Sequence, residues 1–484
     1  MKVLMCFPPP EEGLRVPKGG NFGDWYGVGP SYLQSYLEQH GHQTEAHLDY
    51  YACWDEYHHE LMRLIYMFEP DYIAVQVYSM NRINAYNIAN ICKEHNIKCV
   101  FGGVHASALP QQTLDHYPWI QVVVGEGERA LLDIVEGCED RIVQHPLIED
   151  LDTIPFPKHE YFFRIRPERK MACIITSRGC PFSCSFCCLP NISYRRLRKR
   201  SVESVIEEIV QLKKEYPQIE GISFQDEAFT LDSKRVIQIC DRLIELDLGL
   251  LFSMAGTVKG NTEEMFKKME LAGLEHLYVG LETGNQEVLD RANKKLKLEE
   301  VERLFYNSRK YPKVIISLYL ITGLPGETWE SVKDTVKFIK KLQKIRYAFV
   351  DFSTIIWVFP GTQIYEIAKE KGVVDDEYWF TGGDSPNYTG EHDMQELVDM
   401  QQYVLNRISF TRIFTPLCFF HQMTNSPIEV LKFAWYHKRF VKFALGESLG
   451  YMFPRLYQKI RGYKINERWL PERNKTRTKL NKVE

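Results

Sequence analysis

A short run of cysteines, Cys180, Cys184 and Cys187, constrains this chain more than any other feature of its sequence. Thiols spaced C-x-x-x-C-x-x-C can face one metal centre with little loop between them. A [4Fe–4S] cluster contains four irons and is held by thiolates, so three cysteines would leave one iron open to a small molecule. Zinc ribbons need a second CxxC pair, which the chain lacks at the usual separation. Chance packing of small buried thiols is the alternative, and the close spacing argues against it.

The residues around this run resemble the signature of the radical SAM superfamily, in which an aromatic side chain, here Phe186, precedes the third cysteine. Residues 174–179 resemble the strand and turn that carry the cysteine loop in that family. The resemblance implies that S-adenosylmethionine (SAM) chelates the open iron and is cleaved to a 5′-deoxyadenosyl radical. It also implies that Phe186 lies against the adenine and that Cys188 is not a ligand.

Length and composition indicate a folded protein of several domains. A chain of 484 residues is long enough for roughly two to four domains, each with its own core. The other cysteines are scattered, which suits free thiols in a reducing cytoplasm. The net charge of −4 gives no general attraction to nucleic acid, so no nucleic-acid partner is expected. The N-terminal apolar run is too short for a signal peptide, and no stretch approaches the roughly 18 apolar residues of a membrane span. We therefore expect a cytoplasmic protein.

Residues 1–140 alternate strand and helix patterns, which predicts a doubly wound, Rossmann-like α/β domain. The expected helices lie near residues 31–39 and 85–94. The expected strands are residues 3–7, 44–48, 72–77, 98–101 and 122–124. Ligands of such sheets bind beyond the carboxyl ends of the strands, where glycines allow close approach of the backbone. The motif G-x-G-x-x-G is absent, so a dinucleotide is not favoured.

Three segments at these strand ends, residues 75–79, 102–107 and 124–128, resemble the cobalamin-binding domain fused to many radical SAM enzymes. The resemblance implies cofactor contacts from Tyr78, Ser79, Gly102, Gly103, His105, Gly125 and Glu126. The D-x-H-x-x-G motif that places a histidine on cobalt in related proteins is absent. The lower face of cobalt would then meet residues 78–82 or water, and His105 is not expected to be a cobalt ligand.

A connector at residues 141–170 leads into a second α/β repeat at residues 171–375. Pro155 and Pro157 give the connector the composition of a stiff linker. Six expected strands follow, each ending in polar or glycine residues, as in barrels whose chemistry lies at the carboxyl ends of the strands. The radical SAM family has a partial (β/α)6 barrel of TIM type, and the strand count agrees. Ser201 is expected to cap the first helix after the cysteines.

Two carboxylates at strand ends of this repeat are candidate SAM contacts. Glu282 lies in a segment similar to the family's G-x-E-[ST]-G, which faces SAM, and pairing with a nearby lysine is the alternative. Asp226 replaces a glycine of the Gly-Gly-Glu turn that binds the SAM amino group in other branches. The basic run at residues 194–200 indicates either a solvated face or an arginine that contacts the SAM carboxylate or an anionic substrate.

Residues 376–484 change to helical patterns rich in aromatics and predict a mostly helical domain with a basic tail. A polar loop is expected at residues 379–392. The aromatics, among them Phe410, Phe414, Phe440 and Phe443, indicate either the core of a helical cap or an apolar substrate pocket. The tail is expected either to make peripheral contact with an anionic membrane surface or to be disordered.

Together the resemblances imply a cobalamin-dependent radical SAM enzyme, and methylation of an unreactive carbon is the favoured activity. The implied cofactors are a [4Fe–4S] cluster, SAM and cobalamin. The implied partners are a reductant such as flavodoxin or ferredoxin and a small-molecule or lipid-like substrate. Three alternatives stay open: a non-methylating cyclase or rearranging enzyme, a cobalamin carrier without activity, and a two-cluster methylthiotransferase that would use Cys6, Cys53 and Cys92.

Overall fold

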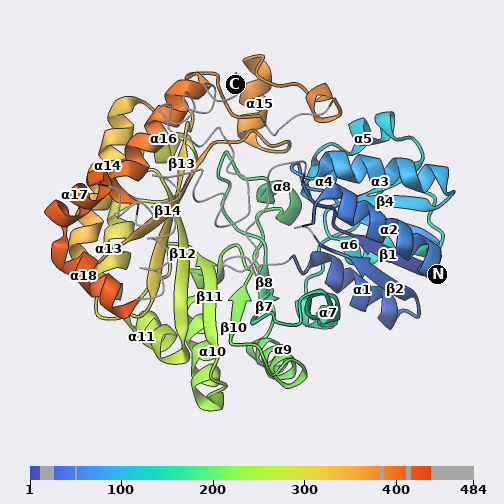
Figure 1. Ribbon diagram of the computed structural model, residues 1–484, viewed down its shortest axis with the longest axis horizontal. Helices are drawn as coiled ribbons and strands as arrows, with labels where there is room; N and C mark the ends of the chain where they lie inside the picture. The colour runs from blue at the N-terminus through green and yellow to red at the C-terminus, as the bar shows by residue number, and fades with distance from the viewer. Residues whose placement is uncertain (11–26, 50–51, 382–385, 410–415, 438–484) are drawn as a thin grey trace, which may run out of the picture.

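A computed structural model describes residues 1–10, 27–49, 52–381, 386–409 and 416–437. Two six-stranded parallel sheets with their helices make up most of this structure (Figure 1). The first sheet lies at one end of the molecule, and the second, with its helices, fills the centre and the other end. The predicted α/β class is therefore confirmed.

The first sheet has the strand order β2–β1–β3–β4–β5–β6 and buries apolar side chains on both faces. Helices α1 (Gly29–Gln39) and α6 (Gly127–Val135) cover one face, and α2 (Trp54–Phe68) and α3 (Arg82–Glu94) cover the other. Two short helices, α4 (Val104–Ala108) and α5 (Pro110–His116), follow β4. The strands are β1 (Lys2–Cys6), β2 (Gln43–His47), β3 (Tyr72–Gln76), β4 (Lys98–Gly102), β5 (Ile120–Val124) and β6 (Ile142–Gln144).

The predicted connector belongs to the fold instead of acting as a spacer. Strand β6 lies inside it and extends the first sheet beyond the predicted boundary. The 3-10 helix η1 (Leu151–Thr153) and helix α7 (Glu160–Ile165) follow. Leu151, Ile154 and Phe162 are buried in the core of the first sheet, which also receives Cys173 from the second sheet. The two sheets therefore share a packed boundary.

The second sheet has the strand order β14–β13–β12–β11–β10–β7, in which every pairing is parallel. Because β7 and β14 stand at the two ends of this order, the barrel is open, as predicted. The strands are β7 (Met171–Ile174), β10 (Gly221–Phe224), β11 (Leu251–Gly256), β12 (Leu274–Glu282), β13 (Ile315–Thr322) and β14 (Phe349–Ile355).

Helices follow the barrel strands in turn and pack on the outside of the sheet. As predicted, Ser201 caps the first of the long ones, because its hydroxyl accepts a hydrogen bond from the Ser204 N–H (3.1 Å). The outer helices are α9 (Val202–Glu215), α10 (Ser233–Leu246), α11 (Glu263–Ala272), α13 (Leu298–Ser308) and α14 (Trp329–Ile345). The short helix α8 (Leu189–Ser193) lies between the barrel and the first sheet, and Val288 of the short helix α12 (Gln286–Arg291) packs in a separate core. A pair of two-residue strands, β8 (Ser177–Arg178) and β9 (Arg198–Lys199), flanks the cysteine loop.

The C-terminal part is mostly helical, as predicted, but its first long helix packs into the core of the barrel. Met400, Val404 and Ile408 of α16 (Met394–Ile408) are buried in the barrel core. Before it come α15 (Gln363–Glu370) and the 3-10 helix η3 (Glu377–Trp379), and after it α17 (Pro416–Asn425) and α18 (Pro427–Tyr436). No described helix is both long and apolar enough to cross a membrane. The basic tail and the aromatics predicted at Phe410, Phe414, Phe440 and Phe443 lie outside the described residues.

Trp379 joins the C-terminal part to the first sheet, although it begins the segment predicted to be a polar loop. Its side chain is fully buried. The Arg82 Nε donates a hydrogen bond to the Trp379 carbonyl (3.0 Å), and the guanidinium lies 5.1 Å from the indole ring. The next residue, Phe380, stacks on Tyr86 and His116. This aromatic contact fixes the first sheet against the barrel.

Replacing Trp379 with alanine should lower the free energy of unfolding by about 3–5 kcal/mol, because it leaves a large cavity next to a buried guanidinium. Urea denaturation measures the change. Tyr306→Ala on α13, where the side chain is exposed, is the control and should change stability by at most about 0.5 kcal/mol. Equal losses in the two variants would contradict a special role for Trp379.

Candidate cofactor site

The three predicted ligands, Cys180, Cys184 and Cys187, lie in one loop after β8, and all three are partly buried. The Cys187 N–H donates a hydrogen bond to the Cys184 carbonyl (3.1 Å), which closes a turn between these two residues. Burial raises the pKa of each thiol, that of Cys187 to about 12. The thiolates therefore form most readily when a metal centre compensates their charge.

This donor set fits an iron–sulfur cluster. Within the described ranges, no three metal-binding side chains converge on a single ion. In a four-iron cluster each thiolate binds a different iron, so the ligands surround a group of atoms instead of one point. Three cysteines in one short loop suit such a cluster and leave one iron for another ligand.

Glu282 and Lys294 form an ion pair beside the cysteine loop. The Lys294 Nζ lies 2.6 Å from the Glu282 Oε1 and 5.9 Å from the centre of the Phe186 ring. Burial opposes the lysine charge, but attraction to Glu282 and Cys184 raises the pKa of Lys294 above its ordinary value. The lysine in turn lowers the pKa of Cys184, against the larger effect of burial. Two predicted SAM contacts, Phe186 and Glu282, are thus brought together with the cysteines.

Pairing with a nearby lysine is the alternative role that the sequence left open for Glu282. The sequence did not identify Lys294 as that lysine. The backbone of Glu282 has a φ of +68°, which is uncommon for a residue other than glycine. Gly280 makes room for the pair, because a Cβ on it would collide with the Glu282 carboxylate and lie 3.0 Å from the Lys294 Nζ. The end of β12 is therefore shaped around this carboxylate.

Asp226 has a different role from the predicted SAM contact. One carboxylate oxygen accepts the Thr176 N–H (2.7 Å), and the other accepts the hydroxyls of Thr176 and Ser177. Asp226 thereby ties the end of β10 to the start of the cysteine loop. The neighbouring Glu227 accepts the Gly179 N–H (3.1 Å), and burial raises the pKa of this carboxyl. Glu227, not Asp226, reaches the cavity described next.

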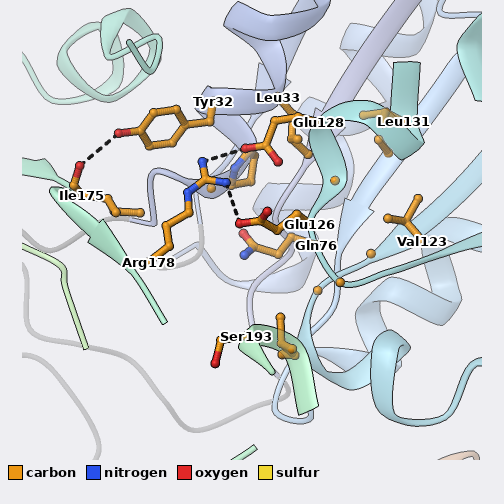
Figure 2. A pocket seen from close by; sticks show the side chains of 18 of the residues that line it. Tyr32, Leu33, Gln76, Val123, Glu126, Glu128, Leu131, Ile175, Arg178 and Ser193 are labelled. Atoms are coloured by element: carbon orange, nitrogen blue, oxygen red, sulfur yellow. Dashed lines mark hydrogen bonds and ion pairs between the residues drawn. The ribbon is translucent and has the colours of Figure 1, made fainter. Parts of the chain in front are cut away.

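A cavity of about 270 Å³ lies between the first sheet and the cysteine loop (Figure 2). Most of its wall is apolar, and it is formed by the carboxyl ends of β1, β3, β4 and β5 together with α1, α6 and α8. The predicted contacts Gly102, Gly103, Gly125 and Glu126 all line it. At Gly103 (φ +94°) an added Cβ would lie 2.9 Å from the Val77 carbonyl, so the strand end must stay free of a side chain.

The cavity fits part of a corrinoid. Its volume is far too small for the corrin ring but suits a side arm, and its apolar wall suits an aromatic base. The glycines let the backbone approach such a ligand closely. The sheet therefore has the position, shape and lining that a cobalamin domain needs.

Ser79 and His105 do not line the cavity but belong to a buried polar network. The Ser79 Oγ lies 2.9 Å from the His105 Nδ1, and the Tyr86 hydroxyl lies 3.4 Å from the Nε2. Burial, and to a lesser extent Arg82, lowers the pKa of His105 to about 3, so the ring is neutral. Both ring nitrogens are engaged within the protein, in keeping with the expectation that His105 is not a cobalt ligand.

Tyr78, like Ser79 and His105, is not among the residues that line the cavity. Its ring packs edge-on against Phe7 at a centroid distance of 5.4 Å. Burial raises the pKa of Tyr78 to about 12, and the charges of Cys188 and Glu227 act in the same direction. The influence of Cys188 and Glu227 places the Tyr78 hydroxyl within reach of charges at the cysteine loop.

Ion pairs across the domain boundary hold one wall of the cavity, and Figure 2 shows Arg178 reaching from the barrel toward Glu126 and Glu128. Arg178 donates to the Glu128 Oε1 (2.7 Å) and the Glu126 Oε1 (3.2 Å), and Arg198 donates to both oxygens of Glu126 (2.8 Å each). Burial alone would raise the pKa of Glu126, but Arg198 and Arg178 hold it below its usual value. Glu126, predicted to contact the cofactor, is thus mainly an interdomain ion-pair partner.

The ion pairs also show what the side chains of the basic run at residues 194–200 contact. Arg198 and Arg200 are buried and pair with Glu126 and Glu208, while Arg196 is exposed and pairs with Glu149. The run is therefore not a uniformly solvated face, because two of its arginines are buried and paired. The roles of Arg178 and Glu128 were not predicted from the sequence, because no local motif indicates that two residues about fifty positions apart form an ion pair.

Comparison with known proteins supports the assignment of the two parts. The radical SAM superfamily model matches residues 174–339, and the B12 binding domain model matches residues 21–135. An uncharacterized methyltransferase of Pyrococcus horikoshii is 30% identical over 393 residues, which cover 76% of this chain and 83% of that protein. The chain belongs to the cobalamin-binding radical SAM enzymes.

Two further matches place this radical SAM enzyme among its relatives. The anaerobic magnesium-protoporphyrin IX monomethyl ester cyclase of Rubrivivax gelatinosus is 28% identical over 374 residues, which cover 70% of this chain and 66% of the cyclase. The radical SAM methyltransferase TsrM from Kitasatospora setae superposes with a TM-score of 0.67 and 17% identity, covering 84% of this chain and 90% of TsrM. The structural similarity to TsrM supports the assignment of the fold.

Replacing Arg198 with alanine should lower the free energy of unfolding by about 3–5 kcal/mol, because it removes one of the two arginines from the buried Glu126 carboxylate. Arg196→Ala, two positions away, is the matched control. That arginine forms an exposed pair with Glu149, and its loss should cost at most about 1 kcal/mol. Urea denaturation of both variants tests the difference, and a loss at Arg198 no larger than at Arg196 would contradict the interdomain role.

Proposed function

We propose that this enzyme transfers a methyl group to an unactivated carbon, using a 5′-deoxyadenosyl radical and cobalamin. The observation that carries the proposal is the shared wall between the two cofactor sites. Arg178, Gly179 and Ser193, from the cysteine side, line the same cavity as Gly102 and Gly125 of the first sheet. A substrate between the two sites would meet both.

When bound, the cluster with SAM supplies the radical, and cobalamin supplies the methyl group. The three cysteines would hold the cluster. The Glu282 carboxylate would accept hydrogen bonds from the ribose hydroxyls of SAM, and its ion pair with Lys294 would fix its orientation. The Phe186 ring would cover the adenine.

On the other side of the site, Gly102, Gly103 and Gly125 would admit the corrinoid to the strand ends. Tyr78 would lie near the bound corrinoid, and its hydroxyl stays protonated at neutral pH because burial raises its pKa to about 12. Glu126 and His105 would act through the wall and the buried network rather than by direct contact. Packing between the sheets would keep water away from the reactive centre.

A non-methylating cyclase is the second candidate, because the Rubrivivax gelatinosus relative is described as one. The Pyrococcus horikoshii relative, which is more similar to this chain, is described as a methyltransferase and favours the first. The fold is common to both relatives, so the products must decide between them.

A two-cluster methylthiotransferase is disfavoured by the geometry of its proposed ligands. Cys6 lies in β1 and Cys92 in α3, and both are buried in the apolar core between the first sheet and its helices. Burial raises the pKa of Cys6 well above that of an ordinary thiol. These side chains serve the packing of the sheet and are not presented to a cluster.

Radical SAM enzymes need an electron donor, and we propose a flavodoxin or a ferredoxin for this one, in the cytoplasm. The substrate is proposed to be a small molecule or a lipid-like molecule. No nucleic-acid partner is proposed, and the interdomain arginines Arg178 and Arg198 are paired with carboxylates.

Product analysis with methyl-deuterated SAM tests the proposed activity. The anaerobic enzyme with cluster, cobalamin and reductant is given small-molecule and lipid extracts, and the label is followed by mass spectrometry. Methyl transfer predicts a labelled product and equal yields of S-adenosylhomocysteine and 5′-deoxyadenosine, with no 5′-deoxyadenosine from Cys184→Ala. A modified but unlabelled product formed with 5′-deoxyadenosine would overturn methylation and favour the cyclase.

Gly102→Leu should weaken cobalamin binding at least about tenfold, because the new side chain extends into the cavity. Gly102→Ala is the control, since its Cβ would lie 3.8 Å from the Val123 Cβ, an ordinary contact. Titration of cobalamin followed by absorbance measures the affinity. Unchanged binding by Gly102→Leu would show that the cofactor lies elsewhere.

A further inference from the structure

Helix α12 ends in a turn that carries two polar side chains to the cysteine loop. Asn293 has a φ of +52°, the left-handed conformation that asparagine tolerates at the end of a helix. The Asn293 N–H donates to the Asp290 carbonyl (3.1 Å), and the Lys294 N–H donates to the Leu289 carbonyl (2.9 Å). These two hydrogen bonds are those of a Schellman motif. The backbone of Asn293 and Lys294 is therefore fixed by the helix that precedes it.

This turn holds the cysteine loop on both sides of Cys184. The Asn293 side-chain amide donates to the Ser183 carbonyl (2.7 Å) and to the oxygen of the Ser183 hydroxyl (3.0 Å). The Ala292 carbonyl accepts a hydrogen bond from the Ser185 N–H (2.9 Å). The residues before and after Cys184 are thus bonded to consecutive residues of the turn, which keeps this cysteine in one position relative to it.

The ion pair of Lys294 and Glu282 has its positive end toward the thiols. The Lys294 Nζ lies 2.6 Å from the Glu282 Oε1 and 5.9 Å from the centre of the Phe186 ring, which belongs to the cysteine loop. Burial has the largest effect on the pKa of Cys184 and raises it, and Lys294 comes next and lowers it, ahead of Glu282, which raises it. The side chains of Lys294 and Glu282 are only 21% and 8% exposed, so water and salt screen their charges little.

A cation in this position favours the reduced form of an iron–sulfur cluster. A [4Fe–4S] cluster held by three thiolates is negatively charged, and the uptake of one electron makes it more so. A nearby positive charge lowers the energy of the reduced form and therefore raises the reduction potential. Glu282 opposes this effect, but Lys294 acts more strongly on Cys184 and its contribution is the larger one.

We propose that Lys294 raises the reduction potential of the cluster, so that the electron donor can reduce it before SAM is cleaved. The cluster gains one electron and the donor, a reduced flavodoxin or ferredoxin, loses one, while no covalent bond forms or breaks. Asn293 is a positioning residue that keeps the lysine beside the cysteine loop. This inference goes beyond methyl transfer and does not depend on it, because the cluster is reduced before the substrate reacts.

Potentiometric titration of the full-length enzyme with its cluster, followed by electron paramagnetic resonance in the absence of SAM, tests the proposal. Lys294→Met should lower the equilibrium constant for one-electron reduction at least about tenfold, which is a shift of about 59 mV. Lys294→Arg keeps the charge and should stay within about twofold of the parent. The matched control is Lys295→Met, which removes the exposed lysine next in the sequence and should also stay within about twofold.

Two further variants decide the question if Lys294→Met does not fold, because that change leaves the Glu282 carboxylate buried without its cation. Glu282→Gln removes the negative end of the ion pair and should raise the potential. Lys294→Met/Glu282→Gln removes both charges and should lower the potential by less than Lys294→Met does. An iron content of about four per chain and unchanged thermal unfolding identify the variants with an intact cluster and fold.

The proposal is overturned if Lys294→Met and Lys295→Met have the same potential, or if Lys294→Arg lowers the potential as far as Lys294→Met does, because the lysine would then act through packing and not through its charge. A lowered potential in Glu282→Gln would contradict it as well. The absence of a methylated product in the labelling experiment would leave these potentials unchanged, so this proposal and the proposed function can fail separately.

Discussion

The ion pairs of Arg178, whose side chain is largely shielded from solvent, are the interaction on which the rest of this structure depends. Arg178 lies two positions before the first cluster cysteine, donates to Glu126 and Glu128 of the first sheet and lies 5.1 Å from the Tyr32 ring. A charge in this position is tolerated only when it is paired and hydrogen-bonded. The barrel and the first sheet therefore meet in the one arrangement that supplies both carboxylates, and this arrangement sets where the cysteine loop lies relative to the cavity.

On the barrel side, the buried carboxylate of Asp226 anchors the start of the cysteine loop. Asp226 binds Thr176 and Ser177, and Arg235 donates to the Thr176 carbonyl (2.9 Å). The start of the loop is thus fixed from two directions before the cysteines begin. Preorganisation of this kind is what a metal site needs, because ligands that are already in place lose little freedom on binding.

Features that depend on local sequence were predictable. Buried parallel strands appear as short apolar runs, so five strands of the first sheet and all six of the barrel were found. The cysteines lie within eight residues, and their spacing is itself the signal.

Side-chain roles at the domain boundary were not predictable in the same way. The partners of Glu126 lie 52 and 72 positions away, and His105 is held by Ser79 and Tyr86 in a network that no motif marks. Trp379 looked like part of a polar loop, because its partner Arg82 is 297 positions distant.

The central claim is that the cluster and cobalamin occupy adjacent sites that share a wall. Pulsed electron paramagnetic resonance tests it most directly, on holoenzyme in which the reduced cluster and cob(II)alamin are both paramagnetic. The account predicts a strong magnetic interaction between the two spins, which is absent when either cofactor is omitted. Two independent signals without measurable coupling in the fully loaded enzyme would contradict it.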